Sequence, residues 1–148
     1  MSFTVTKVDV WAAKLKDKPG GLAKVLGVLG NAGANLECVI ARRDPGKAGT
    51  GVAYITPVTG AGIRKAAKTG GLAPAEKIAT LKVEGDDAPG LGNRITSAIA
   101  EAGVNMRGVS GAVIGKKFVV YLGFDNSTDA TKAARALKKL GSTKKSGK

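Results

Sequence analysis

Two short segments of the chain carry polar groups at the same spacing and could bind a small zwitterion. Asp17-Lys18-Pro19-Gly20 is followed fifteen residues after its glycine by Asn35, and Asp87-Ala88-Pro89-Gly90 is followed at the same interval by Asn105. An aspartate offers a negative oxygen to an ammonium group. The start of a helix offers unpaired N–H groups and a partial positive charge to a carboxylate. The asparagine amides offer both donors and acceptors.

These two segments lie seventy positions apart, and the glycines before the asparagines, Gly33 and Gly103, repeat at the same offset. Self-similarity at a fixed period indicates a fold built from copies of one unit. Each copy is predicted to run strand, helix, strand, strand, helix, with a short or missing last strand. Helices packed on one face of a small antiparallel sheet give the α+β class, so we predict two α/β sandwiches in tandem.

The elements follow from hydrophobic spacing. The first strand is predicted over residues 5–15, and Pro19 is predicted to open a helix that Gly33 ends. Further strands are predicted over 36–41 and 52–56, and in the second copy over 106–113 and 119–124. We predict boundaries at 1–76 for the first copy and 77–140 for the second, with residues 141–148 as a basic disordered tail.

This order, with Asp-x-Pro-Gly before an apolar helix and Gly-x-Asn before the next strand, resembles the ACT domain family. The resemblance covers residues 5–140 and is greatest to stand-alone proteins made of two such domains. It implies two ferredoxin-like βαββα(β) sandwiches and a non-catalytic regulatory protein that binds a free amino acid, across a domain interface, and relays the event to a partner. A unit of about seventy residues is marginally stable alone, so we expect the two copies to pack on each other or the chain to form a homodimer. The second copy departs from the pattern, because Gly92 stands where the family has the leucine that Leu22 provides.

The candidate ligand-binding residues come from both loops and from the strand starts after the helices. They are Asp17, Lys18, Pro19, Gly20, Gly21, Asn35 and Leu36 in the first copy, and Asp87, Gly90, Asn105 and Met106 in the second. A structural interpretation stays open beside the functional one. Aspartate before a helix is a common N-cap, and asparagine after a glycine is a common turn residue.

The composition narrows the function classes. The chain of 148 residues has no histidine and a single cysteine, Cys38, which is predicted to be a buried small hydrophobe. Catalytic triads and histidine metal sites are therefore excluded, and we predict no enzyme, no metal and no cofactor. A lone cysteine excludes an internal disulfide and fits a reducing cytoplasm. No apolar run reaches the roughly 20 residues of a membrane span.

The net charge of +13 supports one alternative function. From Lys132 onward the chain has seven basic residues and no acidic one, a bias that attracts nucleic acid through phosphate contacts. Aromatic residues make up only 4% of the chain, which argues against base stacking on a sheet. Amino-acid binding is therefore the leading hypothesis, and phosphate-driven binding of nucleic acid is the alternative.

Overall fold

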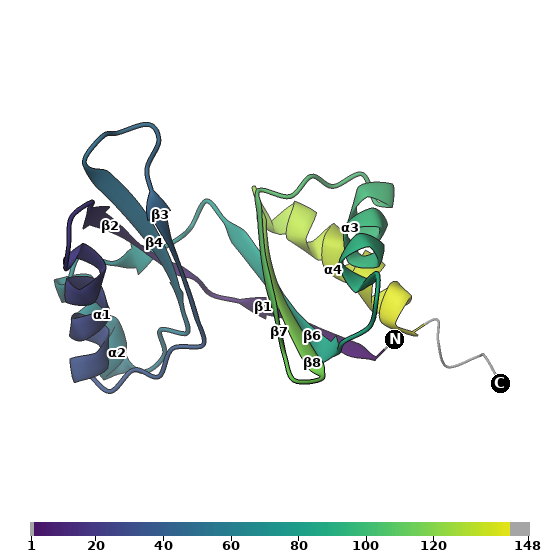
Figure 1. Ribbon diagram of the computed structural model, residues 1–148, viewed down its shortest axis with the longest axis horizontal. Coiled ribbons are helices and arrows are strands. Elements are labelled where there is room, and N and C mark those ends of the chain that lie inside the picture. The colour runs from purple at the N-terminus through teal and green to yellow at the C-terminus, as the bar shows by residue number, and fades with distance from the viewer. Residues whose placement is uncertain (1, 143–148) are drawn as a thin grey trace. The chain divides into compact units, whose positions relative to one another are not determined.

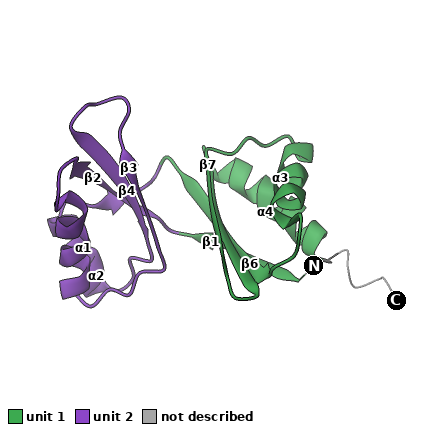
Figure 2. Cartoon of the chain, in the orientation of Figure 1, with its two compact units in different colours: residues 1–8, 77–148 green, residues 9–76 purple. Residues whose placement is uncertain are grey.

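The computed structural model describes residues 2–142 and contains two compact units, each with a four-stranded antiparallel sheet and two helices. Unit 2 is continuous and spans Asp9–Glu76, whereas unit 1 combines Met1–Val8 with Lys77–Lys148 (Figure 2). In each unit both helices lie on one face of the sheet (Figure 1). The predicted α+β class and the tandem of two sandwiches are confirmed. The predicted tail begins in the last helix, and residues 143–148 lie outside the described residues.

Unit 2 contains the first of the predicted loops. Its elements are β2 (Trp11–Lys16), α1 (Gly21–Asn31), β3 (Cys38–Arg43), β4 (Thr50–Thr56), α2 (Ala61–Thr69) and β5 (Ala73–Pro74). The strands lie in the order β3-β4-β2-β5. The buried side chains of the strands, the helices and their connections form one core, consisting of Trp11, Ala13, Val25, Leu29, Ala53, Ile55, Val58, Ala67 and Leu72.

Unit 1 contains the second loop. Its elements are β1 (Phe3–Val8), β6 (Ala79–Asp86), α3 (Leu91–Glu101), β7 (Gly108–Ile114), β8 (Lys117–Phe124) and α4 (Ser127–Ser142), and its strand order is β1-β6-β8-β7. The largest fully buried side chains of its core are Phe124, Leu81, Ile95, Ile99, Leu122, Leu137 and Val83.

The first predicted strand differs from the structure. Residues 5–15 are not one strand, because β1 ends at Val8 and β2 begins at Trp11, and the two strands belong to different sheets. β1 pairs with β6 from Phe3↔Gly85 to Val8↔Thr80 and takes the sheet position that β5 takes in unit 2. Residues 1–8 therefore belong with the second copy and not, as the predicted boundary of 1–76 has it, with the first. Phe3 and Val5 pack against the core of unit 1, and this packing explains why β1 belongs to unit 1 and not to unit 2.

Candidate functional site

The first loop joins β2 to α1 through a glycine in the left-handed conformation. The N–H of Lys18 donates to the carbonyl of Lys16 (2.9 Å), and the N–H of Gly21 donates to the carbonyl of Lys18 (3.0 Å). Gly20 has φ +85° and immediately precedes the helix, a conformation that favours glycine. The side chain of a larger residue at position 21 would overlap the carbonyl of Lys16. The loop therefore needs both glycines for backbone reasons, whether or not a ligand binds.

Asp17 is held by the neighbouring hairpin and not by the helix. Its Oδ2 lies 2.8 Å from Nε of Arg43, at the end of β3. Its N–H donates to the carbonyl of Gly49 (3.0 Å). No side chain caps the start of α1, so the interpretation of Asp17 as an N-cap is wrong. The carboxylate is still about one third exposed and lies at the predicted loop.

A hollow of about 620 Å³ opens beside this loop. It receives four of the predicted residues, Lys18 to Gly21, together with further lysines of β2 and α1. The full lining is Lys14, Leu15, Lys16, Lys18, Pro19, Gly20, Gly21, Lys24, Val25, Val28, Thr69 and Gly70. Sequence reasoning missed Lys14, Lys16 and Lys24. Lys14 and Lys16 alternate along β2, so they share one face of the strand, and Lys24 lies one turn into α1. These positions were signals that could have revealed all three lysines.

The second loop has a hollow of a different character, with a volume of about 420 Å³. Asp87 and Gly90 line it, and most of the other lining residues are apolar: Ala88, Leu91, Gly92, Ile95, Gly111, Ala112, Val113, Phe118 and Val120. Gly90 has φ +77°, which matches Gly20. As at the first loop, no side chain caps the helix, so Asp87 is not an N-cap either. The N–H of Asp87 donates to the carbonyl of Lys116 (2.9 Å).

Asp86, beside this loop, forms an ion pair and hydrogen bond with Lys117. The hydrogen bond from Lys117, and then its charge, hold the pKa of Asp86 below its usual value. The pair joins the end of β6 to the start of β8, and it is lost as the pH falls through the lowered pKa and the carboxylate is protonated.

We expect Lys117→Met to raise the pKa of Asp86 toward that of an ordinary aspartate, because the variant removes both the hydrogen bond and the charge. Carboxyl-detected NMR titration measures this shift. Lys116→Met is the control, because only the backbone carbonyl of Lys116 contacts the loop. An unchanged Asp86 titration in Lys117→Met would contradict the pairing.

The two asparagines lie far from the loops of their own copy. Asn35 follows α1 and Asn105 follows α3, and each helix has 11 residues. At a rise of 1.5 Å per residue, about 16 Å of helix separates each asparagine from the loop at the other end. Asn35 and Asn105 are exposed, whereas the residues after them, Leu36 and Met106, pack against the two cores. The structure thus brings Lys18 to Gly21 together at the first hollow, leaves Asp17 in the loop but outside the lining, and leaves Asn35 apart.

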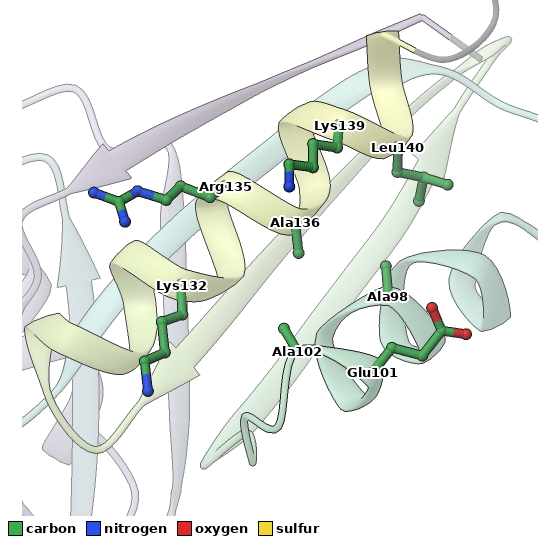
Figure 3. Close-up of a pocket in the computed structure, with 8 residues that line it drawn as sticks. All are labelled: Ala98, Glu101, Ala102, Lys132, Arg135, Ala136, Lys139 and Leu140. Carbon is green, nitrogen blue, oxygen red and sulfur yellow. The ribbon is translucent and has the colours of Figure 1, made fainter.

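A third hollow, of about 530 Å³, lies between α3 and α4. Ala98 and Ala102 of α3 face Ala136 of α4 across it, while the side chain of Glu101 points away from α4 (Figure 3). Lys132, Arg135 and Lys139 line it from the α4 side. None of the predicted ligand-binding residues lies here, and the cations belong to the basic segment that the sequence singled out.

The described residues give little support for a reactive thiol, a metal site or a membrane-spanning helix. Cys38 is half-buried in β3 and not fully buried as predicted, and burial raises the pKa of its thiol, which disfavours the reactive thiolate. Within residues 2–142 no group of three or more acidic or cysteine side chains is placed to hold a metal ion. Among the same residues, no helix has the length and apolar character required to cross a bilayer.

Comparisons with known proteins agree with the arrangement of strands and helices. Residues 79–144 match the family model described as ACT domain. No curated protein sequence matches the chain. Protein BT0572 from Bacteroides thetaiotaomicron is similar in structure, with a TM-score of 0.76 and 17% identity over 92% of this chain and 90% of that one.

The ligand-free regulatory subunit of aspartate kinase from Thermus thermophilus is also similar, with a TM-score of 0.63 and 17% identity over 94% of this chain and 96% of that one. Aspartokinase III from E. coli, solved with aspartate and ADP, has a TM-score of 0.57 and 12% identity over 93% of this chain and 32% of that one. At these identities the solved structures support the fold alone.

Proposed function

We propose, from the match of residues 79–144 to the ACT domain, that the chain is a non-catalytic regulatory protein that binds a free amino acid at its β–α loops. The observation that carries the proposal is the pair of hollows at corresponding loops, one beside Gly20 and one beside Gly90. Both loops place a left-handed glycine directly before a helix. The ligand carboxylate binds the unpaired N–H groups at the helix start.

The ammonium group of the ligand binds a loop carboxylate. Asp17 is already paired with Arg43, so an ammonium at the first loop either shares or displaces the guanidinium. Asp87 lines its hollow directly, beside the apolar side chains of Leu91, Ile95 and Phe118. The second loop therefore suits an amino acid with an apolar side chain, and the first suits a more polar or anionic one.

We further propose that the asparagines act across a homodimer interface. β3 and β7 are edge strands, each paired on one side only. Antiparallel pairing of one edge strand with its copy would place the start of one strand beside the end of the other. Asn35 of a second copy would then approach Arg43 and Asp17. The exposure of Val109 (51%) and Val113 (53%) on β7 supports a further contact at that edge.

A thermal-shift screen with the common amino acids tests the proposal. We expect at least one amino acid to raise the melting temperature by about 5 °C at ten times its Kd, because ligand binding to the native state adds about 1.4 kcal/mol. Asp17→Ala is expected to weaken binding at the first loop about tenfold, and Asp87→Ala to do the same at the second. Calorimetry measures both affinities.

Asp44→Ala is the matched control, because the carboxylate of Asp44 accepts a hydrogen bond from Gly46 within the β3–β4 loop and does not belong to either of the loops that precede α1 and α3. The proposal fails if no amino acid shifts the melting temperature, or if both loop variants bind as the wild type does.

The alternative function, nucleic-acid binding, is supported by one feature, the row of cations that Lys132, Arg135 and Lys139 form along α4. Phosphate-driven binding weakens steeply as salt is raised. A gel-shift titration with salt therefore separates it from amino-acid binding, which depends on the loops.

A further inference from the structure

β2 loses its outer neighbour halfway along its length. β5 contributes two pairs, Trp11↔Pro74 and Ala12↔Ala73, and the N–H of Ala75 donates to the carbonyl of Val10 (2.8 Å). From Ala13 to Lys16 the strand pairs with β4 alone. In an antiparallel ladder, residues alternate between the two sides. Because Val10 and Ala12 face β5, the backbone N–H and C=O of Lys14 face the open edge.

Unit 1 shows what a complete edge looks like at the same position. There β1 pairs with β6 over six residues, from Thr80 to Gly85. The offset of seventy places Lys14 at the position of Glu84, which pairs with Thr4. The next pair, Phe3↔Gly85, brings an aromatic ring over the core, where it meets Phe118 edge-to-face at 6.3 Å. Within the described residues, unit 2 has no strand that corresponds to this half of β1.

The open edge borders the hollow of about 620 Å³ beside the first loop. Four lysines line this hollow, Lys14, Lys16, Lys18 and Lys24, and its lining includes no acidic residue. Leu15, Val25 and Val28 add apolar surface to it. The edge thus combines unpaired backbone groups, an apolar patch and a concentration of positive charge.

We propose that Ala13–Lys16 of β2 accept an extended acidic segment of a partner protein as an additional antiparallel strand. The backbone of the segment pairs with Lys14 and extends the sheet. Its alternate side chains are acidic beside the lysines, and one apolar side chain between them contacts Leu15 and Val28. The charge of the hollow selects a carboxylate-bearing sequence, and the strand edge selects a peptide over other anions.

The chain itself offers no suitable segment for this edge. Residues 143–148 contain three lysines and no acidic residue, so like charges oppose their binding beside Lys14 and Lys24. β1 also carries a lysine and no carboxylate, and it is engaged in unit 1. The occupant is therefore an acidic segment of another protein, and its side chains contact the same hollow that the proposed function gives to an amino acid at the first loop.

Fluorescence anisotropy with the labelled pentapeptide Glu-Glu-Phe-Glu-Glu tests the proposal on the full chain. We expect the double variant Lys14→Glu/Lys24→Glu to weaken binding about tenfold or more, because two favourable charge pairs become repulsive. Lys47→Glu, in the β3–β4 loop, changes the net charge at a site outside the hollow and is the control. We expect it to leave the affinity within about twofold.

Two further probes separate strand pairing from simple charge attraction. N-methylation of peptide residues 2 and 4, both glutamates, removes backbone donors without changing charge, and we expect at least a fivefold loss of affinity, about one hydrogen bond. Replacing the phenylalanine by glycine is expected to weaken binding similarly. The proposal is overturned if the pentapeptide does not bind, or if the N-methylated and glycine peptides bind as tightly as the parent. It is also overturned if Lys47→Glu weakens binding as much as the double variant.

Discussion

Removal of residues 2–8 is expected to unfold unit 1 and to leave unit 2 folded. The deletion removes β1, which is one of the two edge strands of the unit 1 sheet and forms six residue pairs with β6. It also removes Phe3 and Val5 from the core. Full burial of such a side chain contributes about 1.5–3 kcal/mol, and each of these two, being partly buried, contributes less than that. A small domain has only about 5–15 kcal/mol of stability in total.

Amide hydrogen exchange measures the result in each unit. We expect the amides of β6, β8 and α4 to lose protection, and those of β4 and α1 to keep it. The fluorescence of Trp11, the one tryptophan of the chain, reports on the core of unit 2, where its side chain is 5% exposed. Its unfolding transition should stay near that of the full chain.

Phe3→Ala and Thr4→Ala refine this prediction as a matched pair on adjacent residues. Phe3 packs on the core and contacts Phe118, whereas Thr4 is exposed. We expect a loss of about 2–4 kcal/mol for Phe3→Ala and less than about 0.5 kcal/mol for Thr4→Ala. The prediction is contradicted if Phe3→Ala and Thr4→Ala lower the free energy of unfolding equally. It is also contradicted if the amides of β6 keep their protection from exchange after the deletion, because unit 1 would then not need β1.

Gly21→Ala is expected to destabilise unit 2 by about 3 kcal/mol and to abolish binding at the first loop. An added Cβ would overlap the backbone carbonyl of Lys16, and a backbone atom cannot move aside as a flexible side chain can. The start of α1 must then shift away from β2. This shift deforms the hollow that Lys18, Pro19 and Gly20 line.

Gly27→Ala is the control for this change within the same helix. Nothing lies within 4 Å of a Cβ added at Gly27, and the residue is exposed in the interior of α1. Alanine there is expected to stabilise the helix by about 0.5–1 kcal/mol. Chemical denaturation followed by Trp11 fluorescence measures both variants. A Gly21→Ala protein as stable as the wild type would mean that the loop adapts to the added Cβ. The close contact between position 21 and the carbonyl of Lys16 would then make no contribution to the stability of unit 2.

Much of the fold follows from patterns in the sequence. The glycines and prolines at both helix entries, and the repeated Gly33 and Gly103, predict the two helices after the loops, and the structure confirms them. The strand after each helix was predicted two residues early, over 36–41 and 106–113. Residues 34–37 and 104–107 instead form a connection, and strand pairing begins at Cys38 in β3 and at Gly108 in β7.

The exchange of β1 between units was not predictable from periodicity. Phe3 and Val5 face one core, and Trp11, Ala13 and Leu15 face the other, but all five lie at odd positions. Between them the pattern is irregular, because Lys7 and Asp9 are exposed at odd positions and Val8 and Val10 are half-buried at even ones, but this irregularity does not tell which sheet the first strand joins. Only the pairing of β1 with β6, more than seventy residues away, reveals the break.

The candidate site was predictable in part. The Asp-x-Pro-Gly spacing located both loops, and a hollow borders each of them. The pairing of Asp17 with Arg43 depends on the register of β3 against β4, which a local motif does not contain. The lysines around the first hollow come from three consecutive segments, which are β2, the loop and α1.

The position of β1 also sets an order in which the chain can fold as it leaves the ribosome. Unit 2 is continuous, so all its contacts are available once residue 76 has emerged. β1 is made before all of unit 2, yet its partner β6 begins only at Ala79. Throughout that interval Phe3 and Val5 remain on an unpaired strand, the kind of segment that promotes aggregation of nascent chains. β1 is thus synthesised before every strand of unit 2 and is paired only after them, and unit 1 depends on its being kept available until then.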